Sequence, residues 1–318
     1  MRPPESEQPA VHHLSDAVAL PNLPGLYDLS GRRIDVAAHQ TISPRAAEIR
    51  RRKVYEKLPE LIKLPPDLDV VEGPILLGGC LFKHYGHYLI DSMSRLWARH
   101  RFPSLPILFT KDRKWKTPPA YSHEILGRLG LLSRVFWVDR PTLFRQVFCP
   151  GTAFEYRSKV YSDADEPHRR VADAAGVTGD GRWSRPVYLT RSGLRDEQVR
   201  SAAEPELEQQ LSGRGVEIVR PETLPLADQI ALFEQAPAVI GTTGSALHTV
   251  LFSRRSGSRL AILSSGRGLE NYLMIDCLKQ NNTHYLKCIE RRTEEGEHVL
   301  DVQLALSLLE RSGFLDIS

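Results

Sequence analysis

Residues 185–252 contain the groups with the clearest chemical use. Gly241 to Ser245, with the sequence GTTGS, stand between two apolar runs, as in a turn that joins a buried strand to a helix. The first N–H groups of such a helix carry partial positive charge and bind anions, phosphates above all. Arg191 ends an earlier strand-like run, and its guanidinium can reach the same anion because the carboxyl ends of parallel strands share one edge. These residues predict a bound diphosphate, with a nucleotide-sugar as the leading candidate.

Hydroxyl and imidazole groups around the glycine turn could add further contacts. Thr242, Thr243 and Ser245 supply hydroxyls, Gly244 supplies backbone, and His248 follows on the next helix. We expect these residues to contact the phosphates or the sugar. A simpler explanation stays open for each, because hydroxyl side chains also cap helices and a histidine at that position can be a hydrogen-bonded core residue.

A second polar group lies on a predicted amphipathic helix over residues 84–102. At about 100° per residue, His84, His87, Asp91 and Arg95 fall within one arc of such a helix. His87 and Asp91, four positions apart, could form an imidazole–carboxylate pair that accepts a proton from an attacking hydroxyl. From spacing alone, a pair that only hydrogen-bonds neighbouring loops is equally consistent.

The same side chains could in principle hold zinc. However, the spacing H-x-x-H-x-x-x-D of His84, His87 and Asp91 is not a standard zinc signature, and the chain has no C-x-x-C pair. We therefore predict no metal site. The cysteines are expected to be buried free thiols of a reducing compartment, and they are Cys80, Cys149, Cys277 and Cys288.

Strand-like and helix-like runs alternate along most of the chain. This alternation predicts parallel sheets covered on both faces, and an α/β fold of two Rossmann-like domains that face a cleft. We expect a first domain over residues 71–178 and a second over 185–318, whose last helix can cross back to the first. The linker candidate is TGDGRWS, residues 178–184. The strand-like runs are residues 70–79, 106–110, 134–138, 185–191, 216–221, 238–242, 259–265 and 283–290.

The segment before the first domain shows weaker patterns. Residues 1–70 are expected to form an extension that packs on that domain. Within it, residues 1–20 show little periodicity and are expected to be loose. Residues 44–63 predict a helix with a charged face that ends before two prolines.

Composition bounds the classes of function. The chain has 318 residues, 41% of them hydrophobic, and a net charge of +3, which indicates globular domains and no nucleic-acid partner. No signal peptide or membrane span is apparent, so we expect a cytoplasmic protein with at most a peripheral contact at the inner membrane. The fingerprints of dinucleotide-binding dehydrogenases, P-loop NTPases and serine hydrolases are missing from the sequence.

Four sequence blocks, in their order along the chain, resemble family 61 glycosyltransferases. The family includes plant xylosyltransferases, animal protein N-acetylglucosaminyltransferases and many bacterial members associated with surface polysaccharide. The compact length and the lack of an anchor resemble a bacterial member. The blocks are HYGHYLIDSMSRL (84–96), VYLTRS (187–192), EIVRPETLPLADQIALFEQA (217–236) and IGTTGSALHTVLF (240–252).

The resemblance implies a glycosyltransferase B fold that inverts the anomeric carbon and has no obligatory metal or other cofactor. A nucleoside-diphosphate sugar would be the donor, and a glycan or polysaccharide hydroxyl would accept the hexosyl or pentosyl group. Arg191 and the backbone at Gly244 and Ser245 would neutralise the leaving diphosphate. His87 or Asp91 would act as base on the acceptor side.

Two positions depart from the pattern of many family members. Thr243 stands where they have a histidine, and Thr249 stands where they have an asparagine. A module that binds nucleotide-sugars or glycans without turnover is therefore an alternative to the transferase. A nucleotide-sugar epimerase is another.

Overall fold

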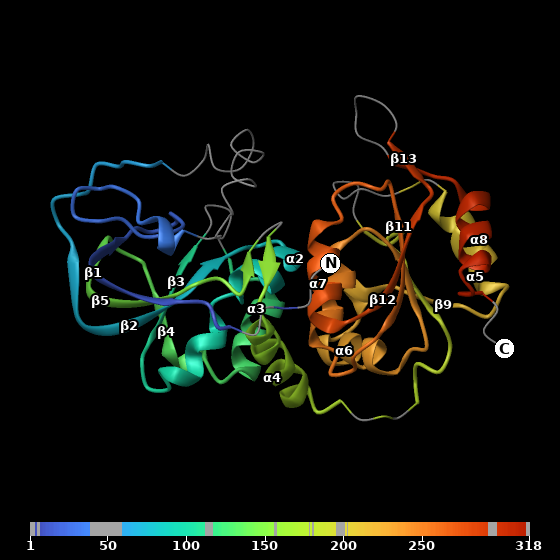
Figure 1. Ribbon diagram of the computed structural model, residues 1–318, viewed down its shortest axis with the longest axis horizontal. Helices are drawn as coiled ribbons and strands as arrows, with labels where there is room; N and C mark the ends of the chain where they lie inside the picture. Colours follow the sequence, from blue (N-terminus) through green and yellow to red (C-terminus); the bar gives the residue numbers. More distant parts are fainter. Residues whose placement is uncertain are drawn as a thin grey trace. The chain divides into compact units, whose positions relative to one another are not determined.

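The computed structural model describes residues 4, 7–38, 59–111, 117–155, 158–177, 179, 181–194, 201, 203–291 and 298–315. The chain divides into two compact units, Met1–Ala174 and Ala175–Ser318. Each unit contains a five-stranded, mostly parallel sheet with helices, which agrees with the predicted α/β class and with two Rossmann-like domains (Figure 1). The cleft and the domain boundaries given above stay predictions.

The sheet of the first unit has the order β1-β5-β2-β3-β4. All neighbours are parallel except β1 and β5. Its core includes Ile75, Leu108 and Phe144, none of which is exposed to solvent. The strands of this unit are β1 (Val11–Ala19), β2 (Asp69–Leu81), β3 (Ile107–Lys111), β4 (Val135–Trp137), β5 (Thr142–Pro150), β6 (Phe154–Glu155) and β7 (Lys159–Val160). The helices are η1 (Asp35–Ala37), α2 (Tyr85–His87), η3 (Tyr88–Ser92), η4 (Leu96–Arg101), α3 (Ala120–Arg128), η5 (Leu132–Arg134), η6 (Ser162–Ala164) and α4 (Asp165–Ala175).

Two strands of this sheet, β1 and β5, are not predicted by the sequence pattern. The expectation that residues 1–20 are loose is wrong for residues 11–19, which form β1. β1 pairs along its length with β5, and Arg145 forms a 2.6 Å ion pair with Asp16 across the two strands. The partner strand lies about 130 positions later in the chain. The strand therefore depends on a long-range pairing that local periodicity does not report.

The continuous amphipathic helix expected over residues 84–102 is also wrong. A single turn, α2, leads into the π-helical turn η3, in which Met93 N–H donates to the carbonyl of Tyr88 at 3.2 Å. Serine side chains then bind backbone of neighbouring segments: Ser92 Oγ accepts from Phe82 N–H, and Ser94 Oγ accepts from Phe154 N–H, each at 2.9 Å. Serine side chains compete with helical hydrogen bonds in this way, so tertiary contacts override the helical pattern.

Arg95 does not join the polar arc that the sequence predicts. A π-helical turn takes up more residues than an α-helical turn, so Arg95 is rotated away from His87 and is 1% exposed. Its guanidinium donates to the carbonyls of Val36 at 3.0 Å and Ala38 at 2.7 Å, and also to the carbonyl of Pro150. Arg95 therefore joins the chain before β2 to the end of β5 within the first unit.

The helix predicted over residues 44–63 falls mainly outside the described residues. Its last part, residues 59–63, is described and is not helical, since Leu61 forms an isolated bridge with Arg32. Backbone pairing with the loop around Gly31 replaces the helical bonds there.

The sheet of the second unit is parallel throughout, with the order β12-β11-β10-β8-β9. Its strands are β8 (Val187–Leu189), β9 (Glu217–Val219), β10 (Val239–Thr242), β11 (Arg259–Ser264) and β12 (Asn282–Lys287), followed by a hairpin of β13 (Ile289–Arg291) and β14 (His298–Leu300). The helices are α5 (Glu204–Ser212), η7 (Pro221–Thr223), α6 (Leu226–Gln235), η8 (Ser245–Phe252), α7 (Glu270–Lys279) and α8 (Val302–Arg311).

Helices cover both faces of this second sheet. On one face, Tyr188 and Ile240 pack with Leu207 of α5 and Leu309 of α8. η8 packs with α6 and α7, which lie on the other side of the sheet (Figure 1). β8 thus connects to a helix on one face, and its neighbour β10 connects to a helix on the opposite face. Parallel α/β sheets bind ligands at such a switch, beyond the carboxyl ends of the strands.

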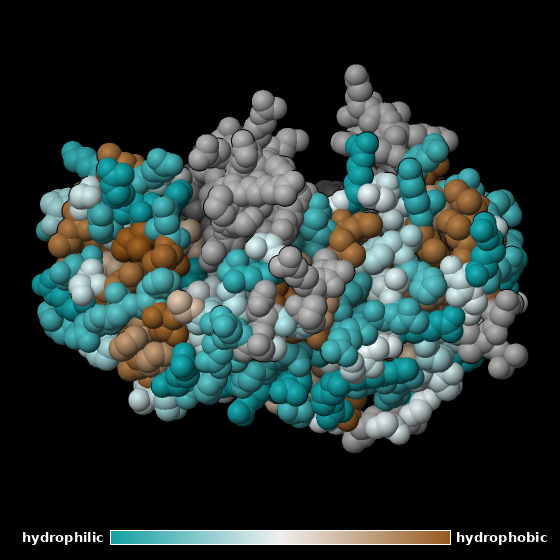
Figure 2. All heavy atoms as spheres, in the orientation of Figure 1, coloured by the Kyte–Doolittle hydropathy of each residue, from teal (hydrophilic) through white to brown (hydrophobic). Residues whose placement is uncertain are grey.

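The surface mixes hydrophilic and hydrophobic side chains. On the face shown in Figure 2, hydrophobic side chains form separate patches among hydrophilic ones. Among the described residues, no helix has the length and apolar character needed to span a bilayer. The large hydrophobic residues that are exposed in this part of the chain are Leu29, Val36, Leu61, Val70, Trp137, Leu273 and Leu304.

The glycine pair of β2 provides a test of this fold. Gly79 lies at a register shift of the strand and has φ of +116°. We expect Gly79→Ala to lower the free energy of unfolding by about 1–3 kcal/mol, because an L side chain strains that backbone conformation. Gly73→Ala in the same strand is the control, since a Cβ there meets no atom within 4 Å. Urea denaturation measures both, and equal losses would contradict the account of Gly79.

Candidate active site

The switch between β8 and β10 brings together two of the segments that the sequence singles out. Arg191 follows β8, and residues 243–244 follow β10, the strand next to it. Arg191 Nη1 donates to the carbonyl of Thr243 at 2.8 Å. A Cβ built on Gly244 would lie 3.5 Å from the same nitrogen, so the guanidinium lies directly against the turn.

Arg191 keeps most of its hydrogen-bonding capacity for another group. In the described part of the chain, its guanidinium makes one hydrogen bond, to Thr243, and no ion pair with a carboxylate. A guanidinium has five N–H donors in a planar fork that suits phosphate oxygens. The geometry therefore fits an anion placed beside this side chain.

The helix after the turn is η8, a 3₁₀ rather than an α-helix. It begins at Ser245 with Gly244 as its N-cap. Within the described residues, the N–H groups of Gly244, Ser245 and Ala246 have no hydrogen-bond acceptor. These N–H groups are therefore available to an anion, as they would be at the start of an α-helix.

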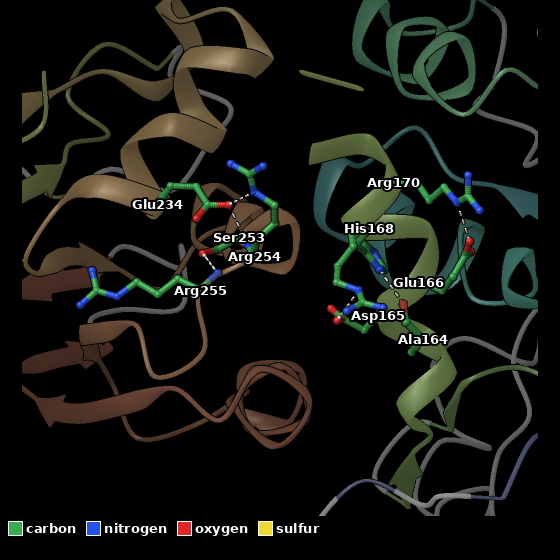
Figure 3. A network of polar contacts seen from close by, with 10 residues as sticks. Ala164, Asp165, Glu166, His168, Arg170, Glu234, Ser253, Arg254 and Arg255 are labelled. Atoms are coloured by element: carbon green, nitrogen blue, oxygen red, sulfur yellow. Dashed lines mark hydrogen bonds and ion pairs between the residues drawn. The ribbon is translucent and has the colours of Figure 1, made fainter. Parts of the chain in front are cut away.

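The end of η8 is also fastened. Arg254 donates to Glu234 of α6 from its backbone N–H at 2.7 Å and from Nε at 3.1 Å (Figure 3). The N–H of Arg255 donates to Ser253 Oγ at 3.2 Å. With this anchor, the end of η8 is held relative to α6.

The other expected contact residues lie deeper. Thr242 is 9% exposed, and its hydroxyl has no hydrogen-bond partner among the described residues. His248 is 6% exposed and contacts the ring of Tyr272 edge-on, with 4.9 Å between centroids. Ser245 is partly exposed. Direct contacts of Thr242, Ser245 and His248 with a ligand stay predictions.

Two residues at this site have no signal in the sequence. Tyr272 of α7 donates from its hydroxyl to the carbonyl of Gly244 at 3.1 Å. Burial raises the pKa of Tyr272 to about 12, while the bond to Gly244 and the charge of Arg191 act in the opposite direction. Neither Tyr272 nor the second residue, Glu204, belongs to a sequence motif. Tyr272 stands alone in an ordinary helical pattern, and Glu204 looks like a surface residue at the start of a helix.

Glu204 is a buried carboxylate beneath the carboxyl end of β8. It is 1% exposed and accepts from Arg191 N–H at 2.9 Å, from the Tyr188 hydroxyl at 2.9 Å and from the Thr190 hydroxyl at 3.4 Å. Hydrogen bonds to a charged acceptor are stronger than neutral ones. Glu204 therefore fixes the backbone from which the Arg191 side chain extends.

Basic side chains also follow other strands of the sheet at this edge. Arg220 comes directly after β9, and Lys287 ends β12, and both are exposed. Positive charges gathered at one edge attract an anionic ligand.

In the first unit, His87 and Asp91 form the pair that their spacing predicts. His87 Nδ1 lies 2.7 Å from Asp91 Oδ2, with His87 44% and Asp91 8% exposed. A carboxylate only accepts hydrogen bonds, so Nδ1 carries the proton and the lone pair lies on Nε2. This pair can take up a proton at Nε2 while Asp91 stabilises the imidazolium that forms.

The turn that carries this pair is held by the side chain of His168 from α4. His168 Nε2 lies 3.0 Å from the carbonyl of Leu89, and His168 Nδ1 lies 2.7 Å from the carbonyl of Ala164. Figure 3 shows the contact with Ala164 and the neighbouring bond from Arg170 to Glu166. Glu166 also accepts from Arg99 at 2.8 Å. The turn is therefore positioned by an element about 80 residues later in the chain.

Within the described residues, no three His, Cys, Asp or Glu side chains come together as a group that could hold a metal. Independence of the reaction from a metal stays a prediction. The four cysteines are unpaired by disulfides, and all except Cys277 are buried.

The family model of glycosyltransferase 61 matches residues 85–260, more than half of the chain. The chain belongs to glycosyltransferase family 61. It is thus a glycosyltransferase, with a sugar donor and an acceptor as its substrates. A search of curated proteins gives no match to this glycosyltransferase.

The family match confirms the resemblance drawn from the four sequence blocks. His87, Asp91, Arg191 and the glycine turn of this glycosyltransferase lie inside the matched residues, whereas Tyr272 lies beyond them. The roles of these residues are the subject of the proposal below.

The buried carboxylate gives a test of how the site is built. We expect Glu204→Gln to lower the free energy of unfolding by about 1–3 kcal/mol, because all three hydrogen bonds end on Oε1, and a neutral amide oxygen accepts them more weakly than a carboxylate does. Glu206→Gln on the same helix is the matched control, since Glu206 is exposed. Chemical denaturation compares the two variants, and a Glu204→Gln protein as stable as the control would refute the role of Glu204.

Proposed function

We propose that this protein is an inverting, metal-independent glycosyltransferase. It moves a hexosyl or pentosyl group from a nucleoside-diphosphate sugar to a hydroxyl of a glycan or polysaccharide. The observation that carries the proposal is Arg191, whose guanidinium lies 2.8 Å from the carbonyl of Thr243 and has no carboxylate partner in the described residues. A bound diphosphate would supply the missing negative charge.

The donor side works by stabilising charge. As the bond from the anomeric carbon to the diphosphate breaks, negative charge grows on the leaving oxygen. Arg191 and the N–H groups at Ser245 and Ala246 are preorganised donors for that charge. Thr242, Thr243, Gly244 and His248 complete the donor site. Arg191 and the N–H groups supply the positive charge that a divalent cation can supply at a phosphate, which is why the proposal includes independence from a metal.

The acceptor side works by removing a proton. The oxygen of the acceptor hydroxyl attacks the anomeric carbon from the side opposite to the leaving diphosphate, so the configuration inverts. The hydroxyl proton passes to His87 Nε2, and Asp91 stabilises the imidazolium. The nucleoside diphosphate leaves with the electron pair of the broken bond.

The biological setting is part of the same proposal. We place the protein in the cytoplasm of a bacterium, with a peripheral contact at the inner membrane and a surface polysaccharide as the acceptor. The resemblance to the family, whose bacterial members are associated with surface polysaccharide, supports this setting.

Nucleotide binding tests the donor site. UDP and GDP are added to the wild type in thermal-shift and calorimetric titrations, with and without Mg²⁺. We expect one of them to raise stability by about 3–4 kcal/mol at a hundred- to thousandfold excess over Kd, and Mg²⁺ to make no difference. Arg191→Ala should abolish this gain and lower turnover about 10²–10³-fold while the protein stays folded.

Arg214→Ala is the matched control, because Arg214 is a cation of the same unit that pairs with Glu310. It should bind and transfer like the wild type. Full activity of Arg191→Ala would contradict the proposal. Binding without transfer to any acceptor in a broad panel would favour the non-catalytic module. Conversion of the donor sugar without an acceptor would favour an epimerase.

The base is tested separately. Asp91→Asn should lower kcat about 10²–10⁴-fold, because the imidazolium loses its stabilising carboxylate, while affinity for the nucleotide stays unchanged. Asp139→Asn is the control, since Asp139 is an exposed carboxylate of the same unit. A kcat for Asp91→Asn equal to that of the control would show that the pair is not the base.

A further inference from the structure

Two donors hold consecutive carbonyls of the glycine turn. Arg191 Nη1 donates to the carbonyl of Thr243 at 2.8 Å, and the Tyr272 hydroxyl donates to the carbonyl of Gly244 at 3.1 Å. Each peptide group is planar and trans, so its C=O and N–H point in opposite directions. A bond to a carbonyl therefore also fixes the direction of the N–H in the same peptide group.

The conformation of Gly244 decides where these N–H groups point. Gly244 is fully extended, with φ of −174° and ψ of 162°. In an extended chain, successive peptide groups point to opposite sides. The carbonyl of Gly244 thus points away from the carbonyl of Thr243, and the N–H of Ser245 points to the side where Arg191 lies. Tyr272 holds the Gly244–Ser245 peptide in this orientation.

The hydroxyl of Tyr272 is rigidly placed. Tyr272 is 8% exposed, and its ring packs edge-on against His248 with centroids 4.9 Å apart. α7, which carries Tyr272, packs against η8, which carries His248. With its pKa raised to about 12 by burial, Tyr272 remains a hydrogen-bond donor at neutral pH.

We propose that Tyr272 is a positioning residue of the donor site, which aims the N–H of Ser245 at the same phosphate oxygens as Arg191. This inference rests on the proposed function. It extends the site beyond the family match, because Tyr272 lies outside residues 85–260. Tyr272 acts through the backbone of Gly244 rather than by touching the ligand.

Tyr272→Phe tests the inference, because it removes the hydroxyl and keeps the ring that packs on His248. Tyr285→Phe is the matched control, because Tyr285 is a tyrosine of the same unit whose hydroxyl donates to Asp276 rather than to the turn. Calorimetric titration with UDP and with GDP gives Kd, and urea denaturation gives stability. We expect Tyr272→Phe to weaken the better-bound nucleotide about threefold to tenfold, and Tyr285→Phe to leave its Kd unchanged.

Hydrogen–deuterium exchange measures the protection of backbone N–H groups in the turn itself, separately from the global free energy of unfolding. Without nucleotide, the peptide containing residues 244–246 should exchange faster in Tyr272→Phe than in Tyr285→Phe. Tyr272→Leu, which also removes the packing on His248, should lose at least as much affinity as Tyr272→Phe.

Unchanged affinity in Tyr272→Phe, with binding lost in Arg191→Ala, would overturn the inference and leave the proposed function intact. A wild type that binds neither nucleotide would overturn both.

Discussion

The contact between the Arg191 guanidinium and the backbone of residues 243–244 organises the candidate site of the second unit. The two segments are 52 positions apart, and the parallel pairing of β8 with β10 makes them neighbours. Glu204 holds the backbone N–H of Arg191 from within the unit, while the side chain meets no carboxylate among the described residues. The Glu204 carboxylate thus has a structural role, while the Arg191 guanidinium is left to bind a ligand.

The first unit shows how a reactive pair can be held without a regular helix. His87 and Asp91 lie on one short turn followed by a π-helical turn. His168, from α4, contacts the carbonyl of Leu89 in that turn, and Arg95 is buried against carbonyls of the chain before β2. Irregular helical turns recur at functional sites, where side chains must be aimed more exactly than a continuous helix allows. The glycosyltransferase 61 family match begins at this turn.

The sequence predicts the parts of the structure that depend on local pattern. Alternating strands and helices give both sheets, and the four-residue spacing gives the contact between His87 and Asp91. The sequence does not predict β1, whose pairing partner is far along the chain, or the break in the helix after His87, which follows from bonds made by Ser92 and Ser94 to other segments. Tyr272 has no sequence signal, because only the packing of α7 on η8 brings its hydroxyl to the turn.

A crystal structure of the protein with bound UDP or GDP tests the central claim most directly. The account predicts that diphosphate oxygens lie within about 2.7–3.2 Å of both the Arg191 guanidinium and the Ser245 N–H. A nucleotide bound elsewhere, with Arg191 still in contact only with protein groups, would contradict it.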